Sequence, residues 1–523
     1  MNLFVILAAV CATSYAQTPV RLKPYPQAQR TLYSLKDAGV PAALSGKSVL
    51  QVSGVGGAAW RGTSHGVWRE DPKAGPGDRK RYFASRRWLP DDRVVSLHAD
   101  SSGGMWVRTE TGVSHIEFHP MTLARKTVPF EVRVQQRHNR HGMVADSSLL
   151  EPGNLASNQK RSSDNDGLWT AMYAVAQCFR YAVTRSPEAL RFARQATEAV
   201  LRLEQITGRP GYPARSIVLP EEPRPRDGVW HWTPDGKLLW KSDTSSDEIV
   251  GHFFLFSAAW DLIPDPDLRQ RLSATTRRIM DHILDNHLTL TDIHGSPTYW
   301  GRWDSEYFQT RRGKPDSPLN SLEILSFLKT AHHITSEPRF EQQYRRLADD
   351  LGYAALTERY IELRGPSINY SDEELAMLSF YPLLKYEKDP KLLQHYRKAL
   401  QAWWQNMERQ KNPLWIFIYA AGLPGAKVRF EDAVWTLQRI PMDLVNWTIA
   451  NSHRDDIQLE PQPDRFGRRQ AITLLPPDER PVMKWNGNPF RIDGGSGGTG
   501  EDDGAFFLLP YWMGRYHRFL AGE

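Results

Sequence analysis

Residues 245–260, SSDEIVGHFFLFSAAW, begin with polar and acidic residues and then stay apolar on nearly every side of a helix. A helix that is apolar all round is buried on all sides. Asp265-Pro266 follow and begin a second helix with a single apolar stripe, which is typical of a half-exposed outer helix. A buried helix followed by a striped partner is therefore the unit that decides the fold.

This pair of helices recurs through the last two thirds of the chain. Buried helices are predicted to begin near Asp164, Ser245, Ser317, Ser371, Asn412 and Glu501. Striped partners are predicted behind Ser186-Pro187, Asp265-Pro266, Glu337-Pro338, Asp389-Pro390 and Glu431-Asp432. The alternation predicts a mainly α fold, an α/α toroid over 161–523. Its buried helices form a parallel inner ring, and their N-termini gather at one end.

The alternation resembles the (α/α)6-toroid glycan-active enzymes, which include polysaccharide lyases, unsaturated-uronyl hydrolases, and related hydrolases and epimerases. The resemblance covers 161–523 and is architectural, because no catalytic motif of a single family is matched. It implies a carbohydrate-active enzyme with a glycan substrate. No cofactor is predicted, since the chain has no P-loop and no dinucleotide fingerprint in a strand–helix context.

A smaller β segment is predicted over 45–135. Gly57–Val67 and Gly104–Val113 share a Trp, a Thr and a Gly turn, and Trp60 and Trp106 lie 46 residues apart. These stretches resemble two-component regulator propeller repeats, which implies two propeller-like blades with structural tryptophans. Two blades cannot close a propeller, which needs at least four. Residues 17–44 form an N-terminal extension in this interpretation, and 136–160 form a linker.

The N-terminus predicts export. Residues 1–16, MNLFVILAAVCATSYA, combine an apolar run with a small-x-small site, as in a secretory signal peptide. A lipid on Cys11 fits poorly, because Ala8-Ala9-Val10 do not suit such a site. Removal of the peptide leaves Cys178 as the single cysteine and excludes an intrachain disulfide. We therefore expect a periplasmic or extracellular protein.

Charge and hydropathy exclude two kinds of partner. The net charge is +6 without a dense basic tract, so no nucleic-acid partner is expected. No later run approaches the 20 or so apolar residues of a membrane span, so none is predicted.

Three long connections lead into the buried helices, namely 208–243, 289–316 and 451–500. Loops of this length within a compact domain are usually functional. Two of them resemble hairpins, one around Thr233–Gly236. They also carry many aromatic residues, and flat aromatic rings stack on sugar faces. The aromatic residues in question are Tyr212, Trp230, Trp232, Trp240, Tyr299, Trp300, Trp303, Tyr307, Phe308 and Trp485.

Acids or amides stand at the start of the buried helices. Helix capping explains such residues equally well, because Asp and Asn are good N-caps and early acids suit the helix dipole. Since all these ends face one funnel, some are expected to line it and to form carboxyl pairs for glycoside cleavage. The residues are Asp164, Asp166, Asp247, Glu248, Asn320, Glu323, Asp372, Glu373, Glu374, Glu501, Asp502 and Asp503.

Asp247, Glu248 and His252 form the sharpest cluster, because Glu248 and His252 lie four residues apart on one helical face. A buried histidine held by Glu248 is the structural alternative. A zinc site is not predicted, because ExxxH lacks a partner histidine. The predicted catalytic residues are Asp247, Glu248, His252, Tyr299, Asp304 and Tyr370. The predicted substrate-binding residues are Asp166, Arg215, Arg302, Trp303, Glu374, Trp415, Lys484, Trp485, Asn486, Asp502 and Asp503.

Two reactions remain open. β-Elimination would use Tyr299, Tyr370, His252 and Arg302, whereas hydrolysis would use Asp247 with Glu248 or Asp502 with Asp503. The Arg, Lys and Asn residues of the long loops favour an acidic, uronate-containing glycan. A non-catalytic glycan-binding or surface-scaffold protein is the alternative to an enzyme.

Overall fold

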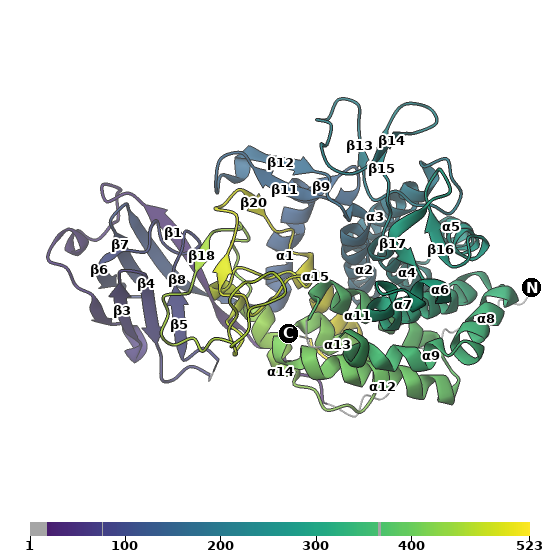
Figure 1. Cartoon of the computed structure of the whole chain (residues 1–523). Coiled ribbons are helices and arrows are strands. Elements are labelled where there is room, and N and C mark those ends of the chain that lie inside the picture. Colours follow the sequence, from purple (N-terminus) through teal and green to yellow (C-terminus); the bar gives the residue numbers. More distant parts are fainter. Residues whose placement is uncertain (1–17, 76, 365–367, 523) are drawn as a thin grey trace, which may run out of the picture.

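The computed structural model describes residues 18–75, 77–364 and 368–522 (Figure 1). The predicted signal peptide, residues 1–16, lies outside the described residues. Helices fill one side of the molecule, together with several short hairpins, and the larger β-sheets lie on the other. No helix in the described part of the chain is long and apolar enough to cross a bilayer.

Within the described residues, six buried helices form a closed inner ring. Each helix contacts the next in chain order, and the last returns to the first. The prediction of a mainly α chain built as an α/α toroid, with a smaller β part, is thereby confirmed. The inner helices are α2 (Asp166–Thr184), α4 (Ser246–Leu262), α7 (Gly313–Thr335), α11 (Tyr370–Tyr386), α13 (Pro413–Gly422) and α15 (Ala505–Tyr516).

Striped helices cover the ring, and several begin with proline behind a capping side chain. Ser186 accepts a hydrogen bond from Ala189 N at 3.4 Å, and Asp265 accepts one from Leu268 N at 3.1 Å. The short helices α9 (Tyr353–Leu356) and α10 (Tyr360–Arg364) extend this layer. Its main members are α3 (Pro187–Gln205), α5 (Pro266–Asp285), α8 (Pro338–Arg345), α12 (Pro390–Met407) and α14 (Phe430–Arg439).

The stretch 45–135 ends in a helix rather than a strand. Residues Leu123–Arg133 form α1, which packs against α15, and Phe130 stacks on Phe507 with ring centroids 4.7 Å apart. The helix therefore covers the ring although it precedes every inner helix in the chain. Pro129 lies inside α1 and obscures its helical pattern in the sequence.

Two four-stranded antiparallel sheets make up the β part. One has the order β2-β3-β4-β5 and the other β1-β8-β7-β6. Strand β1 comes from the predicted N-terminal extension and completes the second sheet. The strands are β1 (Tyr25–Tyr33), β2 (Gln51–Ser53), β3 (Ala59–Thr63), β4 (Gly66–Glu70), β5 (Lys80–Phe83), β6 (Val94–Ala99), β7 (Met105–Thr109) and β8 (Val113–Met121).

The two repeated tryptophans occupy different surroundings. Trp60 on β3 is buried in a core shared by both sheets and stacks on Phe83. Trp106 on β7 is half-buried and lies against His115. Each repeat therefore contributes strands to a four-stranded sheet, while the resemblance to propeller repeats stays a prediction.

A buried ion network joins the sheets to the toroid. Asp478, in the long connection before α15, lies 3.0 Å from Arg81 of β5 and 2.8 Å from Arg439 of α14. Burial raises the pKa of Asp478, but Arg439 and Arg81 together hold it below its usual value. The carboxylate thus ties one sheet, one outer helix and one long loop together.

We predict that Asp478→Ala destabilises the protein by about 3–5 kcal/mol, because two buried guanidinium groups lose their shared carboxylate. The measurement is the free energy of unfolding in urea. The control is Glu110→Ala, which removes an exposed ion pair with Arg93 and should change it by less than about 1 kcal/mol. Equal losses in the two variants would contradict the prediction.

Candidate functional site

Short hairpins surround the end of the ring at which the inner helices begin. Strands β14 (Trp230–Trp232) and β15 (Leu239–Lys241) pair across the predicted turn, which confirms the hairpin expected at Thr233–Gly236. Strands β16 (Thr289–Thr291) and β17 (Pro297–Arg302) form another hairpin, and β17 contacts α4. The long loops thus frame the helix N-termini.

Carboxyl groups from three inner helices converge at this end. Asp247 lies in the first turn of α4, and Asp372 lies in the first turn of α11 with Glu374 just after it. Glu323 lies ten residues into α7. We call these four residues the carboxyl cluster. Burial raises the pKa of Glu323 well above its usual value, and the charges of Asp247 and Asp372 raise it further. The side chains therefore lie close enough to act on one another.

Glu374 is the most isolated acid of the carboxyl cluster. Its residue is 1% exposed, and Oε1 has no hydrogen-bond partner among the described residues. Burial raises its pKa well above the usual value and Asp247 raises it further, while Lys484 opposes the shift. Burial and the charge of Asp247 therefore both favour the protonated form of Glu374.

Capping does not account for most of these acids. The N-caps of α2, α4, α7, α11 and α15 make no side-chain capping hydrogen bond, whereas Asn412 does cap α13. Asp503 is the exception among the acids, because its Oδ1 accepts from Ala505 N at 2.5 Å. The carboxyl cluster is thus available for other interactions.

Trp303 holds one member of the carboxyl cluster. Trp303 is predicted from the sequence to bind substrate. Its side chain is instead fully buried, and Nε1 donates a hydrogen bond to Glu323 Oε2 at 2.8 Å. A buried indole cannot stack on a sugar. Trp303 therefore orients Glu323, whose other oxygen has no hydrogen-bond partner among the described residues.

Lys484 is the cation that acts on Glu374. Its Nζ is 3.3 Å from Asp503 Oδ2 and 5.1 Å from the ring centre of Trp169. Burial lowers the pKa of Lys484, but Asp503 and Asp502 raise it by more. Burial also raises the pKa of Asp502. The predicted group Lys484, Asp502 and Asp503 is thus assembled beside the carboxyl cluster.

Glu248 and His252 face away from the carboxyl cluster. Glu248 Oε1 accepts from Leu168 N at 3.3 Å, and Gly167 is required there because an added Cβ would lie 1.9 Å from Oε2. His252 Nδ1 lies 2.6 Å from the Glu248 carbonyl oxygen. Burial lowers the pKa of His252 to about 4, and its other neighbours are Val200 and Glu204 of α3. Its partner is thus the backbone of Glu248 and not the carboxylate.

The predicted tyrosines lie apart from each other and from His252. Tyr299 is 53% exposed on β17, and the Arg312 guanidinium lies 3.3 Å above its ring. Tyr370 is buried, and burial and then Glu373 raise its phenol pKa. Neither phenol is placed to remove a proton together with His252.

Asp304 and Arg302 line a groove between α5 and α8, outside the ring. Asp304 caps the short helix α6 (Ser305–Gln309) by accepting from Tyr307 N at 2.6 Å. Arg302 lies over the Tyr307 ring at 4.6 Å. Asp304, predicted to be catalytic, and Arg302, predicted to bind substrate, thus both have structural contacts in this groove.

The remaining predicted residues support the frame of the site. Asp166 is buried, accepts from Ser163 and Ser216, and has a pKa raised to about 6 by burial. Arg215 donates to the carbonyls of Asp164 and Asp243 and to Asn165.

Two predicted tryptophans are buried as well. Trp415 is fully buried within the inner ring. Trp485 lines a small cavity with Lys484, Gln410 and Asn412, and its neighbour Asn486 is half-buried. These indoles pack inside the protein, so neither is open to a sugar face.

Asp372 and Glu323 belong to the carboxyl cluster but were not among the predicted site residues. Asp372 has a 14% exposed side chain and lies 2.9 Å from Arg364. Burial raises its pKa to about 7, although Arg364 lowers it. The available signal was position, because both residues stand near a predicted buried-helix start, although α7 itself begins at Gly313, ten residues before Glu323. Capping explained that position equally well in the sequence.

Comparisons with known proteins give low similarity. No protein-family model matches the chain, and no curated protein matches it. Solved structures that match include a sugar epimerase from a ruminal bacterium, with 10% identity, TM-score 0.29, and 76% of this chain and 97% of that chain covered. A metagenome-derived glycoside hydrolase family 9 endoglucanase matches with 12% identity, TM-score 0.31, and coverages of 94% and 99%.

The cellobiose 2-epimerase from Bacillus thermoamylovorans B4167 matches with 9% identity, TM-score 0.29, and coverages of 75% and 97%. What this chain does is therefore inferred from its own residues.

Glu373 provides a test of the electrostatics. It accepts from Gln410 Nε2 at 2.6 Å, and burial raises its pKa to about 8. A carboxyl with a higher pKa in the folded state binds more protons there, so stability falls as the pH rises from about 4 to about 8.

We predict that Glu373→Gln is no more stable than the parent at pH 5. Between pH 5 and pH 8 the free energy of unfolding of the variant should rise relative to that of the parent by at least about 1.4 kcal/mol. The measurement is urea unfolding at both pH values. A difference from the parent that does not change with pH would contradict the prediction.

Proposed function

We propose that the chain is a glycan-active enzyme that hydrolyses a glycosidic bond at the inner-helix N-terminal end of the toroid. The carrying observation is the pair of Glu374 and Asp247. Glu374 is a buried acid with a raised pKa, and Asp247 is a half-buried carboxyl near enough to raise it. Hydrolysis of a glycoside needs one carboxylic acid and one carboxylate in such surroundings.

The proposed chemistry gives each of the two carboxyl groups one role. Glu374 donates its proton to the glycosidic oxygen as the bond from that oxygen to the anomeric carbon breaks. Asp247 either activates the attacking water as a general base or attacks the anomeric carbon as a nucleophile. Its Oδ2 accepts a hydrogen bond from Ser245 Oγ at 2.7 Å. The water adds a hydroxyl group to the anomeric carbon, and the proton it releases restores the acid.

Hydrolysis is favoured over β-elimination. Elimination needs a base beside C5 of a uronate and a cation on its carboxylate. Tyr299 is exposed on β17, the phenol of Tyr370 has a raised pKa, and His252 faces α3. The base that elimination requires is therefore not assembled at the carboxyl cluster.

The contacts of the cations favour a neutral sugar at the reaction centre. Arg215 donates to three loop acceptors, and Lys484 is paired with Asp503. These groups were the predicted partners of a uronate carboxylate. Exposed aromatic residues support sugar stacking at the rim instead, namely Trp232, Tyr299 and Trp300, which are 45%, 53% and 47% exposed. We also propose export, on the strength of residues 1–16.

The test is incubation with a panel of neutral and uronate-containing polysaccharides in water enriched in oxygen-18. We expect new reducing ends that carry the heavy oxygen and no ultraviolet-absorbing unsaturated product. An unsaturated product without solvent oxygen would show a lyase. Glycan binding without turnover, unaffected when Asp247, Glu248 and His252 are replaced by alanine, would show a binding protein.

We predict that Glu374→Gln and Asp247→Asn each lower kcat by about 10²–10⁴-fold on the substrate found. The matched control is Glu373→Gln, the same change one residue earlier, where the side chain faces Gln410 instead. It should retain kcat within a few-fold. Equal losses in Glu373→Gln and Glu374→Gln would contradict the assignment of Glu374 as the acid.

A further inference from the structure

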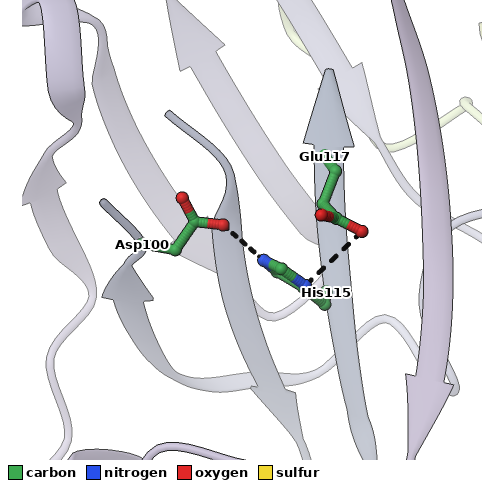
Figure 2. A group of neighbouring side chains, drawn as sticks. All are labelled: Asp100, His115 and Glu117. Atoms are coloured by element: carbon green, nitrogen blue, oxygen red, sulfur yellow. Dashed lines mark hydrogen bonds and ion pairs between the residues drawn. The ribbon is translucent and has the colours of Figure 1, made fainter. Parts of the chain in front are cut away.

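The outer face of the second β-sheet carries three possible metal ligands. His115, Glu117 and His119 alternate along β8, and residues i, i+2 and i+4 of a strand point to one face. This is the face that also carries Trp106, which pairs with His115 across the strands. Figure 2 shows His115 between the carboxyl groups of Asp100 and Glu117.

Asp100 fixes the imidazole of His115. His115 Nε2 lies 2.5 Å from Asp100 Oδ2. The other oxygen of Asp100 accepts from Ser102 N and Gly104 N at 2.6 and 3.0 Å, which holds the carboxylate in the turn before β7. Trp106 stacks on the same imidazole at 3.9 Å with an interplanar angle of 6°. In the neutral tautomer in which Nε2 donates to Asp100, Nδ1 keeps its lone pair.

A second possible metal ligand, the Glu117 carboxylate, lies near Nδ1 of His115. Glu117 Oε2 lies 3.6 Å from His115 Nδ1 (Figure 2). The same oxygen lies 3.8 Å from His119 Nε2. Both distances are too long for hydrogen bonds. Two ligands at about 2.0–2.1 Å from one tetrahedral ion are about 3.3 Å apart, so small side-chain movements would close the site.

We propose that His115 Nδ1, Glu117 and His119 bind one divalent transition-metal ion of the zinc type, with Asp100 as a positioning residue. A metal-binding histidine commonly donates its other N–H to a carboxylate, as His115 does to Asp100. Two imidazoles and one carboxylate suit Zn²⁺ better than Mg²⁺ or Ca²⁺, which prefer oxygen ligands.

Three further observations fit this site. Ligand atoms of Asp100, His115 and Glu117 all lie within 4.8 Å of one another, and His119 lies outside this group. The side chains of His115 and Asp100 are nearly buried, whereas His119 is 48% exposed and can turn toward the ion. Solvent reaches the side chain of His119 on this face, so a water can complete the coordination. The site belongs to the β part and is independent of the proposed hydrolysis.

The test is calorimetric titration of the metal-free full chain with ZnCl₂, with CoCl₂ absorption spectra as a second measurement. We expect one ion per chain, a tetrahedral Co²⁺ spectrum and no saturable binding of MgCl₂. His115→Gln should weaken Zn²⁺ binding at least 100-fold, and Asp100→Asn should weaken it about 10–100-fold. The control His287→Gln removes an exposed histidine of the toroid and should bind as the parent does.

Absence of saturable Zn²⁺ or Co²⁺ binding would overturn the proposal, as would unchanged binding in His115→Gln. Circular dichroism of each variant separates loss of ligand from loss of fold. Glu117→Gln is the second ligand variant, and its surroundings are more exposed than those of His115. Glycan turnover by the metal-free chain does not bear on this result.

Discussion

The closed inner ring imposes the constraint on which the rest of the structure depends. Because its helices begin at one end, acids from three of them lie near enough to raise one another's pKa values. Carboxyl groups that lie near one another in a buried site cannot all be ionised. The raised pKa values of Glu323 and Glu374 favour their protonated forms, the Trp303 indole donates to Glu323, and the charge of Lys484 opposes the shift at Glu374. The positive ends of the helix dipoles also favour the charge that remains.

The β part is connected to this end of the ring by the long loop 451–500. Asp478 in that loop joins Arg81 of a sheet to Arg439 of an outer helix, and the same loop carries Lys484 to the carboxyl cluster. A loop of fifty residues fixed only at its ends would not hold one ammonium group in place. The sheets thus serve the site by anchoring the loop, although they contribute no carboxyl group to it.

Periodicity was enough to predict the ring, because apolar and striped helices differ along their whole length. It missed α1, which covers α15 but lies far from it in the chain and contains Pro129. The site was only partly predictable. Position marked Asp247 and Glu374 as site candidates at helix starts, and this assignment stays a prediction; position gives no physical reason to separate Glu374 from Glu373, whose side chain faces Gln410. Successive residues of a helix point about 100° apart, so direction depends on the rotation of each helix against its neighbours. The same limit applied to Trp303, since no local pattern shows that an indole turns inward toward Glu323.

The energetics of the carboxyl cluster bear on its purpose. Buried acids with unpaired oxygens, such as Glu323 and Glu374, destabilise a fold relative to apolar side chains of similar volume. The outer helices show that this chain uses acids efficiently where capping is the only need, as Asp265 and Asp389 do. A protein that needed only a stable ring would gain by replacing the inner acids with leucine. Their retention at the one end framed by aromatic loops supports a chemical use, because raised carboxyl pKa values are what a general acid requires at neutral pH.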